Sequence, residues 1–358
     1  MKSGLEDVVA AETVLSDVDG TNGRLIMRGV SLDDLAHSSF EDVAALLLDG
    51  FVAMPHDVQT ALGAARQAVF ATIASAGDLT ALAPVDALRA LLARLGDSDD
   101  AETALRLLAA PGVFTPAILR QRQGLAPIAP DASLSQAADA LRVLHGEVPS
   151  AEQEAALNRY LVTVADHGLN ASTFAARVVA STQAGLASSV LAALSALKGP
   201  LHGGAPGPVL DMLDAAGTPA GADGWVRQAL DGGDRLMGFG HRVYRVRDPR
   251  ADALKSAVAM LTKAGAIDPA RLALAEAVET AALTQLRARK PDRVLETNVE
   301  FYTALLLEAL GFPREAFTCV FAMGRVTGWI AHAREQAATG RLIRPMSVYV
   351  GPKVKDAA

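Results

Sequence analysis

The stretch Thr173–Leu197, TFAARVVASTQAGLASSVLAALSAL, indicates most directly what kind of chain this is. Its apolar residues recur at intervals of three and four, which predicts a helix. Ala, Gly and Ser make up much of it, and small side chains let two helix backbones approach closely. The composition favours two interpretations equally: a helix buried within one subunit, or a helix that packs against its own copy in a dimer.

The same periodicity continues on both sides of this stretch, and almost everything after Leu32 is predicted to be helical. Asp-Pro pairs mark two of the helix starts, because Asp caps free N–H groups and Pro at the first helical position needs no donor. The other expected helices are Phe40–Leu48, Val58–Ser75, Pro84–Leu95, Ala101–Leu108, Leu134–Leu144, Ala151–Ala165, Pro249–Ala264, Pro269–Arg289, Val299–Leu310 and Pro313–Ala338.

Ahead of the helices, Thr13–Asp17 and Arg24–Arg28 flank a turn rich in Gly, Asn and Asp. Two short alternating segments around such a turn predict a small β-hairpin. Asp17 and Asp19 resemble the start of a calcium loop, but the later ligands do not follow at the required spacing, which favours the turn. The predicted fold class is therefore all-α with a small N-terminal β-hairpin, and a length of 358 residues suggests two domains.

The composition excludes several classes of protein. A formal net charge of −7 argues against a general basic surface for nucleic acid, and the single cysteine, Cys319, excludes a disulfide framework and any multi-cysteine metal site. The first twenty residues lack the apolar segment of a signal peptide, and Ala184–Leu197 is too short and too rich in serine to cross a bilayer. We expect a cytoplasmic protein that binds neither nucleic acid nor membranes.

Three of the seven histidines, His167, His202 and His241, lie in glycine-rich breaks between predicted helices. Glycine there lets the backbone come close to a ligand. Zinc is disfavoured, because no His-x-x-x-His or Glu-x-x-His pair joins the three. Gly238–Gly240 is not a dinucleotide loop, because no strand precedes it and no third glycine follows. Spacing alone leaves open both a functional site and ordinary solvated loops.

Arginine is the second signal. Four arginines fall within nine residues and three more follow later: Arg242, Arg245, Arg247 and Arg250, then Arg325, Arg341 and Arg344. Guanidinium groups match the geometry of carboxylates and phosphates. In an acidic protein such clusters indicate an anionic small-molecule ligand, although Arg247 and Arg341 are better explained as solvated surface charges.

Several motifs then occur in an order found in a known family. They are Leu201-His202-Gly203-Gly204-Ala205, Met237-Gly238-Phe239-Gly240-His241-Arg242-Val243-Tyr244-Arg245 with Asp248-Pro249-Arg250, Asn298-Val299-Glu300-Phe301-Tyr302, Gly324-Arg325 with Gly328-Trp329-Ile330-Ala331-His332, and Arg344-Pro345. This arrangement resembles the citrate synthases, and the opening Gly4–Thr13 looks like the short bacterial type. The likeness covers nearly the whole chain and is weakest between about Pro55 and Pro149.

The resemblance implies a largely helical, two-domain homodimer. Its large domain would comprise residues 1–203 and 312–358, its small domain residues 204–311, and the active site would lie between them. It implies an acyltransferase that condenses acetyl-CoA with oxaloacetate and hydrolyses the citryl thioester to citrate and CoA. It implies no metal and no cofactor, since the CoA thioester is a substrate.

The resemblance also assigns roles to single residues, and these roles suit the chemistry. A methyl group beside a thioester is a very weak acid, so removing its proton needs a base on one side and stabilisation of the enolate oxygen on the other. Glu300 matches the base, His202 the enol-stabilising donor and His241 the donor that polarises the oxaloacetate carbonyl. The remaining matches are His167, Arg250 and Arg325 as oxaloacetate ligands, Arg344 as an arginine from the partner subunit, and Arg245 as a CoA-phosphate contact.

Glu300 is also the main departure from the family, whose usual motif is Asn-Val-Asp-Phe-Tyr. A glutamate extends the carboxylate by about 1.5 Å, and a misplacement of that size can cost ~100-fold in rate. Because Asn298, Phe301 and Tyr302 remain in pattern, we expect an adjusted backbone and an active enzyme. A second departure is Pro206-Gly207, where the family often has Asn-Glu.

Two other functions remain open. A 2-methylcitrate synthase would use propionyl-CoA, and one methylene in an apolar pocket changes binding by only ~1–3 kcal/mol, so the sequence does not separate the two synthases. A catalytically silent homologue would bind CoA or dicarboxylates without turning them over.

Overall fold

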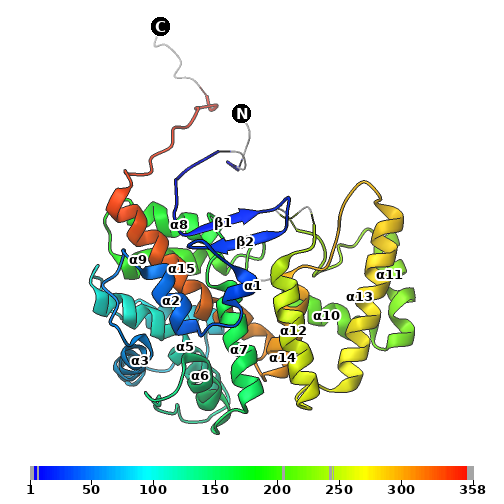
Figure 1. Cartoon of the computed structure of the whole chain (residues 1–358), viewed down its shortest axis with the longest axis horizontal. Helices are drawn as coiled ribbons and strands as arrows, with labels where there is room; N and C mark the ends of the chain where they lie inside the picture. The colour runs from blue at the N-terminus through cyan, green and yellow to red at the C-terminus, as the bar shows by residue number, and fades with distance from the viewer. Residues whose placement is uncertain (1–3, 6–7, 204–205, 242–243, 245, 353–358) are drawn as a thin grey trace.

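The computed structural model describes residues 4–5, 8–203, 206–241, 244 and 246–352. Within these residues the chain is overwhelmingly helical, with one small sheet near its N-terminus (Figure 1), which confirms the predicted fold class. The α-helices are α1 (Leu32–Leu35), α2 (Phe40–Leu48), α3 (Val58–Ala74), α4 (Pro84–Leu92), α5 (Ala101–Arg122), α6 (Gln136–His145), α7 (Ala151–Val164), α8 (Ala171–Ala180), α9 (Leu186–Leu197), α10 (Pro206–Ala216), α11 (Ala222–Asp231), α12 (Pro249–Lys263), α13 (Pro269–Arg289), α14 (Val299–Ala309) and α15 (Phe317–Thr339).

The sheet has three short antiparallel strands in the order β1-β2-β3, namely Ser16–Asp19, Arg24–Met27 and Val30–Ser31. The predicted hairpin has the right turn, but its first strand begins later than predicted and a third strand is added. Asp19 closes the turn by accepting hydrogen bonds from the backbone N–H groups of Thr21 and Asn22, at 3.1 and 2.9 Å. Leu25 and Met27 point inward from β2 and join the core.

The single helix predicted over Thr173–Leu197 is wrong, because the chain breaks there into α8 and α9. Gly185, with φ of 95°, precedes α9, and the carboxylate of Asp97 accepts hydrogen bonds from the N–H groups of Ala187 and Ser188 at 2.8 and 3.0 Å. Asp97 therefore caps α9 from about ninety residues away, at a helix N-terminus that attracts negative charge. Sequence periodicity contains no signal for such a cap.

Two other regions differ from the predicted helices. The helix expected to end at Leu108 continues to Arg122 through Pro111 and Pro116, because residues 107–119 are buried and packing outweighs the lost backbone hydrogen bonds. Helices α10 and α11 carry no prediction, since their glycines and prolines obscure the helical period.

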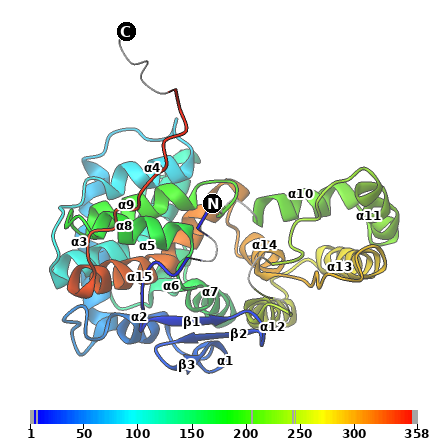
Figure 2. The ribbon, with the colours of Figure 1, turned by 90° about the horizontal axis from the view of Figure 1, so that it is seen from above.

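Helix α15 runs through the larger group of helices and contacts α2, α5, α7, α8 and α9 (Figures 1 and 2). Helices α10, α11 and α13 form a second group at the other end of the molecule. Helices α12 and α14 connect the groups, since both contact α7. The division into residues 1–203 with 312–358 and residues 204–311 stays a prediction, and its boundary at Gly204 lies outside the described residues.

Two glycines let α15 approach the end of α7 unusually closely. A Cβ atom at Gly324 would lie 2.6 Å from the carbonyl oxygen of Leu161, and one at Gly328 would lie 2.5 Å from that of Ala165. The N–H of Gly328 instead donates to the Ala165 carbonyl at 3.1 Å, a bond between helix and loop. This contact determines where the chain immediately after α7 lies relative to Arg325 on α15.

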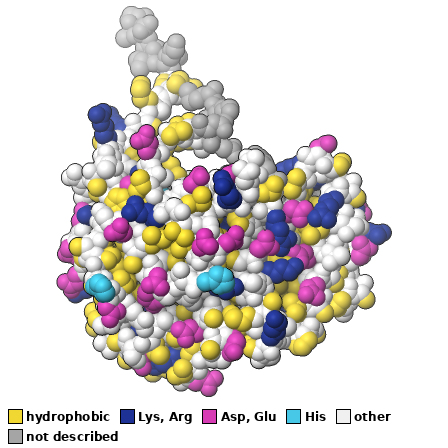
Figure 3. All heavy atoms as spheres, in the orientation of Figure 1, with side chains coloured by type: hydrophobic (Ala, Val, Ile, Leu, Met, Phe, Trp, Pro, Cys, Tyr) yellow, Lys and Arg dark blue, Asp and Glu magenta, His cyan; other side chains and the backbone are white. Residues whose placement is uncertain are grey.

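The surface carries both signs of charge. On the face seen in Figure 3, acidic side chains are interspersed with basic ones, in keeping with the net charge of −7. In the part of the chain that the structure describes, no helix is both long enough and apolar enough to cross a membrane.

The close contact of α15 with α7 predicts a stability difference between two glycine substitutions. Gly324→Ala places a methyl group against the backbone of α7, so we expect a loss of ~1–3 kcal/mol in the free energy of unfolding. Gly224→Ala in α11 is the control, because a Cβ atom there meets nothing within 4 Å, and alanine in a helix should be neutral or stabilising by up to ~1 kcal/mol. Denaturant unfolding measures both; equal stabilities would contradict the prediction.

Candidate active site

The three glycine-rich breaks bring their histidines to one region. His167 follows α7, His202 follows α9 and His241 lies between α11 and α12. The ring centroids of His167 and His241 are 5.8 Å apart, and the ring of Tyr244 lies 5.6 and 4.8 Å from them. The hydroxyl of Tyr244 is 3.2 Å from Nε2 of His167. Tyr244 thus links two of the predicted site residues, a role that its place in the motif did not indicate.

Arg250 is buried beside this cluster, with 5 % of its surface exposed. Asp248 holds its guanidinium in a fork, with Nε to Oδ1 at 3.0 Å and Nη2 to Oδ2 at 2.8 Å. The same carboxylate accepts the N–H of Arg250 at the start of α12 (3.0 Å) and that of Val299 at the start of α14 (3.3 Å). Sequence analysis identified Asp248 only as a helix cap. In the structure its carboxylate binds the Arg250 guanidinium and the first N–H groups of two helices.

Both ring nitrogens of His241 face groups that can only donate a hydrogen bond. The N–H of Tyr244 lies 3.0 Å from Nδ1, and Nη2 of Arg250 lies 3.0 Å from Nε2. Since a neutral imidazole has one acceptor nitrogen, only one of these two groups donates to the ring at a time. Burial, and then the charge of Arg250, lowers the pKa of His241 to about 4. At neutral pH the ring is therefore uncharged and retains one N–H donor.

For His202 the contacts define which nitrogen carries the proton. Both the N–H and the hydroxyl of Ser172 contact its Nε2, at 3.3 and 2.8 Å, so Nε2 is the acceptor and Nδ1 carries the proton. Nε1 of Trp329 donates to the same hydroxyl at 3.0 Å and orients it. Burial, and then Arg325, lowers the pKa of His202 to about 4. Sequence analysis assigned no role to Ser172.

Arg325 lies on α15 and is almost wholly buried, with 1 % of its surface exposed. Its Nε donates to the carbonyl of Val164 at 2.6 Å, and its guanidinium lies 4.8 Å from the ring centre of Phe321. No described residue accepts a hydrogen bond from Nη1 or Nη2. Burial lowers the pKa of Arg325 to about 10, which leaves it charged at neutral pH. A buried cation with two donor groups to spare suits an anionic ligand.

Glu300 occupies the first turn of α14, immediately after its cap Asn298, which accepts the Glu300 N–H at 3.0 Å. The side-chain amide of Asn298 donates to the carbonyl of Gly240 at 2.8 Å, which ties this turn to the segment before His241. No described residue donates a hydrogen bond to the Glu300 carboxylate. Burial raises the pKa of Glu300 to about 7, against the opposing charges of the nearby arginines.

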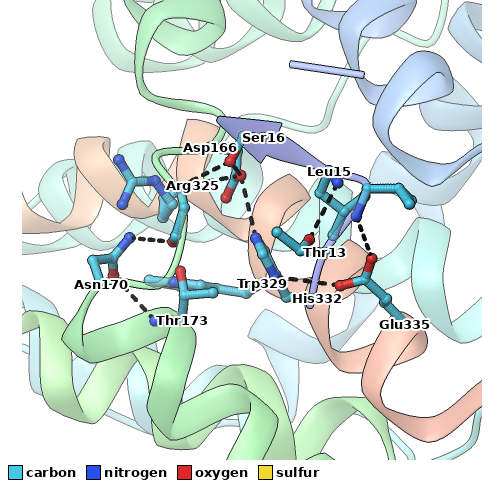
Figure 4. Close-up of polar contacts among 12 residues, drawn as sticks. Thr13, Leu15, Ser16, Asp166, Asn170, Thr173, Arg325, Trp329, His332 and Glu335 are labelled. Carbon is cyan, nitrogen blue, oxygen red and sulfur yellow. Dashed lines mark hydrogen bonds and ion pairs between the residues drawn. The ribbon is translucent and has the colours of Figure 1, made fainter. Parts of the chain in front are cut away.

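Asp166 is fully buried at the end of α7, and sequence analysis gave it no role (Figure 4). The hydroxyl of Ser16 on β1 donates to its Oδ2 and accepts the N–H of Gly168 at 2.9 Å. Nε2 of His332 on α15 lies 3.2 Å from the same oxygen. Burial raises the pKa of Asp166, but His332 and the other partners outweigh it and hold the pKa below its usual value. Asp166 therefore joins β1, α15 and the loop that carries His167.

This network continues away from the site. Arg177 donates to Nδ1 of His332 at 2.8 Å and also contacts the carboxylate of Glu335. Oε1 of Glu335 accepts the N–H of Val14 at 2.8 Å, from the segment before β1. The side chains of Arg177, His332 and Glu335 are buried, whereas that of Val14 is exposed. The result is a line of paired charges that connects the N-terminal segment to the active-site loop.

Two of the sequence-predicted arginines, Arg344 and Arg247, do not join this cluster. Arg344 is exposed on the extended segment after α15, which leads away from the helices (Figure 1). Arg245 lies outside the described residues. Arg247 forms an ion pair with Asp252 at 2.6 Å, in agreement with a surface role.

A cavity of about 550 Å³ borders His241 on the side of α11 and α13. Its lining combines leucines and Phe239 with a basic set, Arg235, Lys290 and Arg293. None of these three cations forms an ion pair with a described carboxylate. Such a combination suits a ligand with both an apolar part and negative groups.

Taken together, two buried arginines, two neutral histidines and a carboxylate with a pKa of about 7 lie within electrostatic reach of one another. His167 belongs to the same group, since burial, Arg250 and Arg325 lower its pKa well below the usual value. The cations and donors can bind a small dianion, and the carboxylate can remove a proton near pH 7.

Comparison with known proteins agrees with this geometry. The family model described as citrate synthase, C-terminal domain, matches residues 4–346. A citrate synthase of Haloferax volcanii is 36 % identical over 99 % of this chain and 97 % of its own, and a 2-methylcitrate synthase of Mycobacterium tuberculosis is 38 % identical over 98 % and 91 %. A Thermoplasma acidophilum citrate synthase, solved with carboxymethyl coenzyme A and oxaloacetate, superposes with a TM-score of 0.86 at 29 % identity, covering 100 % of this chain and 98 % of that one. The chain therefore belongs to the citrate synthase family of enzymes.

Proposed function

We propose that this enzyme condenses acetyl-CoA with oxaloacetate and releases citrate and CoA. The observation that carries this proposal is the pairing of a carboxylate whose pKa is about 7, Glu300, with neutral histidines and the unused guanidinium N–H groups of Arg325. A base with that pKa is ionised often enough at neutral pH to act, yet basic enough to take a proton. The bound CoA analogue and oxaloacetate of the Thermoplasma acidophilum relative support the same pair of substrates.

Oxaloacetate binds among Arg250, Arg325 and His167 in this proposal. Both guanidiniums are buried and charged, so they stabilise carboxylates strongly where water is excluded. The N–H of the neutral His241 ring supplies a further donor to the ketone oxygen, which makes the carbonyl carbon more electrophilic. Arg344 of the partner subunit supplies an additional cation.

The acetyl methyl group lies between Glu300 and His202. Glu300 takes a methyl proton, and the C–H electron pair forms the enol double bond while the Nδ1–H of His202 stabilises the thioester oxygen. The enol carbon then attacks the carbonyl carbon of oxaloacetate. The oxygen of that carbonyl, stabilised by His241, takes up a proton to become a hydroxyl, and this uptake balances the proton that Glu300 removed. Water next attacks the thioester carbonyl, and CoA leaves as a thiol.

The CoA part of the substrate occupies the cavity beside His241. Its phosphates meet Arg235, Lys290 and Arg293, and its apolar parts meet the leucines of the lining. Arg245, on the chain between this cavity and Arg250, remains a further candidate for a phosphate contact. No metal and no cofactor take part in the proposed reaction.

The second candidate is condensation of propionyl-CoA, favoured by the 38 % identity to a 2-methylcitrate synthase. The extra methylene changes the transition-state energy by only ~1–3 kcal/mol in an apolar pocket. The two activities are therefore distinguished by measuring the rate with each acyl-CoA, because no single residue separates them.

We propose further that the enzyme is a homodimer with shared active sites. The exposed segment after α15 carries Arg344 and the side chains of Leu342, Met346, Val348 and Val350, which are all largely exposed in the single chain. An exposed apolar segment of this kind is stabilised when a second subunit covers it.

Thiol release from the acyl-CoA is the direct test. We expect release from acetyl-CoA only when oxaloacetate is present. Comparing the rates with acetyl-CoA and propionyl-CoA shows which of the two is the better substrate.

Glu300→Gln should lower kcat by ~100-fold or more with oxaloacetate binding preserved, because the base is lost but the shape is kept. Glu296→Gln, at a carboxylate that pairs with Arg287 on the surface, is the matched control. Near-normal turnover in Glu300→Gln, or no thiol release by the wild type, would contradict the proposal.

Glu300→Asp tests whether the site has adapted to the longer side chain. If the backbone of α14 holds the carboxylate at the right distance, aspartate is too short and kcat should fall by ~10-fold or more. An increase in kcat would mean that Glu300 is a defect in the site.

The ionisation of Glu300 also predicts a pH-dependent stability. Its pKa is about 7 in the folded chain and near 4.5 in an unfolded one, so the folded state binds the proton more tightly. The stability is highest where the group is protonated and falls as pH rises from about 4.5 through 7, by on the order of 2–3 kcal/mol. Glu300→Gln cannot ionise, so its melting temperature should rise relative to wild type between pH 5 and pH 8. A constant difference across this range would refute the raised pKa.

Shared sites predict that two inactive variants complement each other. Arg344→Ala and Glu300→Gln should each have low activity alone. Co-expressed with different tags and purified as a mixture, they should recover about a quarter of wild-type activity, because half of the dimers are mixed and each has one intact site. Light scattering that shows a fully active monomer, or a mixture no more active than its parts, would exclude the shared site.

A further inference from the structure

The segments that carry His241 and Glu300 are bound to each other by backbone hydrogen bonds. Phe239 and Thr297 form an antiparallel bridge. The N–H of Gly240 donates to the Glu296 carbonyl at 2.8 Å, and the N–H of Asn298 donates to the Gly238 carbonyl at 2.9 Å. Whatever holds this bridge in place therefore positions both side chains.

One buried carboxylate lies directly behind the bridge. Glu279 on α13 has 8 % of its surface exposed. Its Oε1 accepts the hydroxyl of Thr297 at 2.6 Å, and its Oε2 accepts the hydroxyl of Tyr302 at 2.7 Å. Thr297 and Tyr302 are themselves buried and stand on either side of Glu300 in the sequence. Each oxygen of Glu279 is thus used to hold one end of the turn that carries the proposed base.

The geometry of α14 explains how this contact reaches Glu300. Residues two apart on a helix point about 200° away from each other. Tyr302 points toward α13, so Glu300 points to the opposite side, where Arg250 and Arg325 influence its pKa. Fixing the Tyr302 hydroxyl therefore fixes the rotation of the first turn of α14, and with it the direction of the Glu300 carboxylate.

We propose that Glu279 is a positioning residue that sets the reach of Glu300 and, through the bridge, of His241. It does not touch the substrate in this proposal, which rests on the proposed function of Glu300 as the base. Lys255, at 3.7 Å from Oε2 of Glu279 and 5.5 Å from the ring centre of Tyr302, partly neutralises its charge from the solvent side. Such a contact is more important in this chain because glutamate has one more rotatable bond than aspartate, so both the position and the direction of the Glu300 carboxylate must be fixed.

Glu279→Ala and Tyr302→Phe test the proposal by turnover per competent site. Calorimetric titration with oxaloacetate counts the sites, and thiol release gives kcat for each of them. We expect kcat per site to fall by about 10-fold in Glu279→Ala, with less than a twofold change in the KM for oxaloacetate. Tyr302→Phe should show a smaller loss, and Glu279→Gln, which keeps one acceptor oxygen, should recover most of the activity.

A double-mutant cycle with Glu300→Gln separates positioning of the base from a general loss of structure. Once the base is absent, Glu279→Ala should lower kcat per site by much less than its tenfold effect in the wild type, because only the part transmitted through the bridge to His241 remains. Glu41→Ala is the matched control: Glu41 is a buried carboxylate on α2 that accepts the N–H of Gln136 at 2.7 Å, so its loss should reduce the number of sites but not kcat per site. The proposal is overturned if Glu279→Ala loses sites but keeps kcat per site, or if its effect persists undiminished without the base. Absence of condensation in the wild type would instead overturn the proposed function.

Discussion

The close approach of α15 to the end of α7 is the constraint on which the site depends. Because Gly324 and Gly328 have no side chains, the two segments meet backbone to backbone, and Gly328 donates to the carbonyl of Ala165. From that contact Arg325 reaches the carbonyl of Val164, and His332 reaches Asp166. Helix α15 thus places the Arg325 guanidinium in the site and also holds the loop that bears His167. A methyl group at Gly324 or Gly328 would push α15 away from the end of α7.

The site then works through opposed electrostatic effects within a water-poor interior. Burial lowers the pKa values of His202 and His241, so both remain neutral donors, and it raises that of Glu300, so this carboxylate holds a proton more readily than an exposed one. The arginines act in the opposite direction on Glu300 and limit the rise. A base poised near neutrality is therefore a compromise between desolvation and neighbouring charge, and a charged carboxylate at this place lowers the stability of the empty enzyme.

Side chains that do not contact the substrate give the site its accuracy. Ser172 selects the tautomer of His202, the N–H of Tyr244 contacts the ring of His241, and Asp248 orients Arg250 while joining two helix ends. Glu279 extends this set to the turn of Glu300. Each of these groups is buried and bonded at both oxygens or by more than one contact, so its position is defined before a ligand arrives.

The chain alone determined a good deal about this protein. Helical periodicity predicted most helices within a few residues, the turn at Asp19 marked the sheet, and the histidines, arginines and Glu300 were identified because they stand in short motifs whose local order survives folding. The break in Thr173–Leu197 was missed, because Asp97, far away in the sequence, caps the second helix. The continuation of α5 through two prolines was missed, because burial outweighed a local rule. Ser172, Tyr244, Asp166 and Glu279 acquire their roles only from partners that tertiary packing brings within hydrogen-bond distance. A sequence records which groups are present. Tautomers, pKa values and side-chain orientations depend on distances through space, and only the folded chain determines these distances.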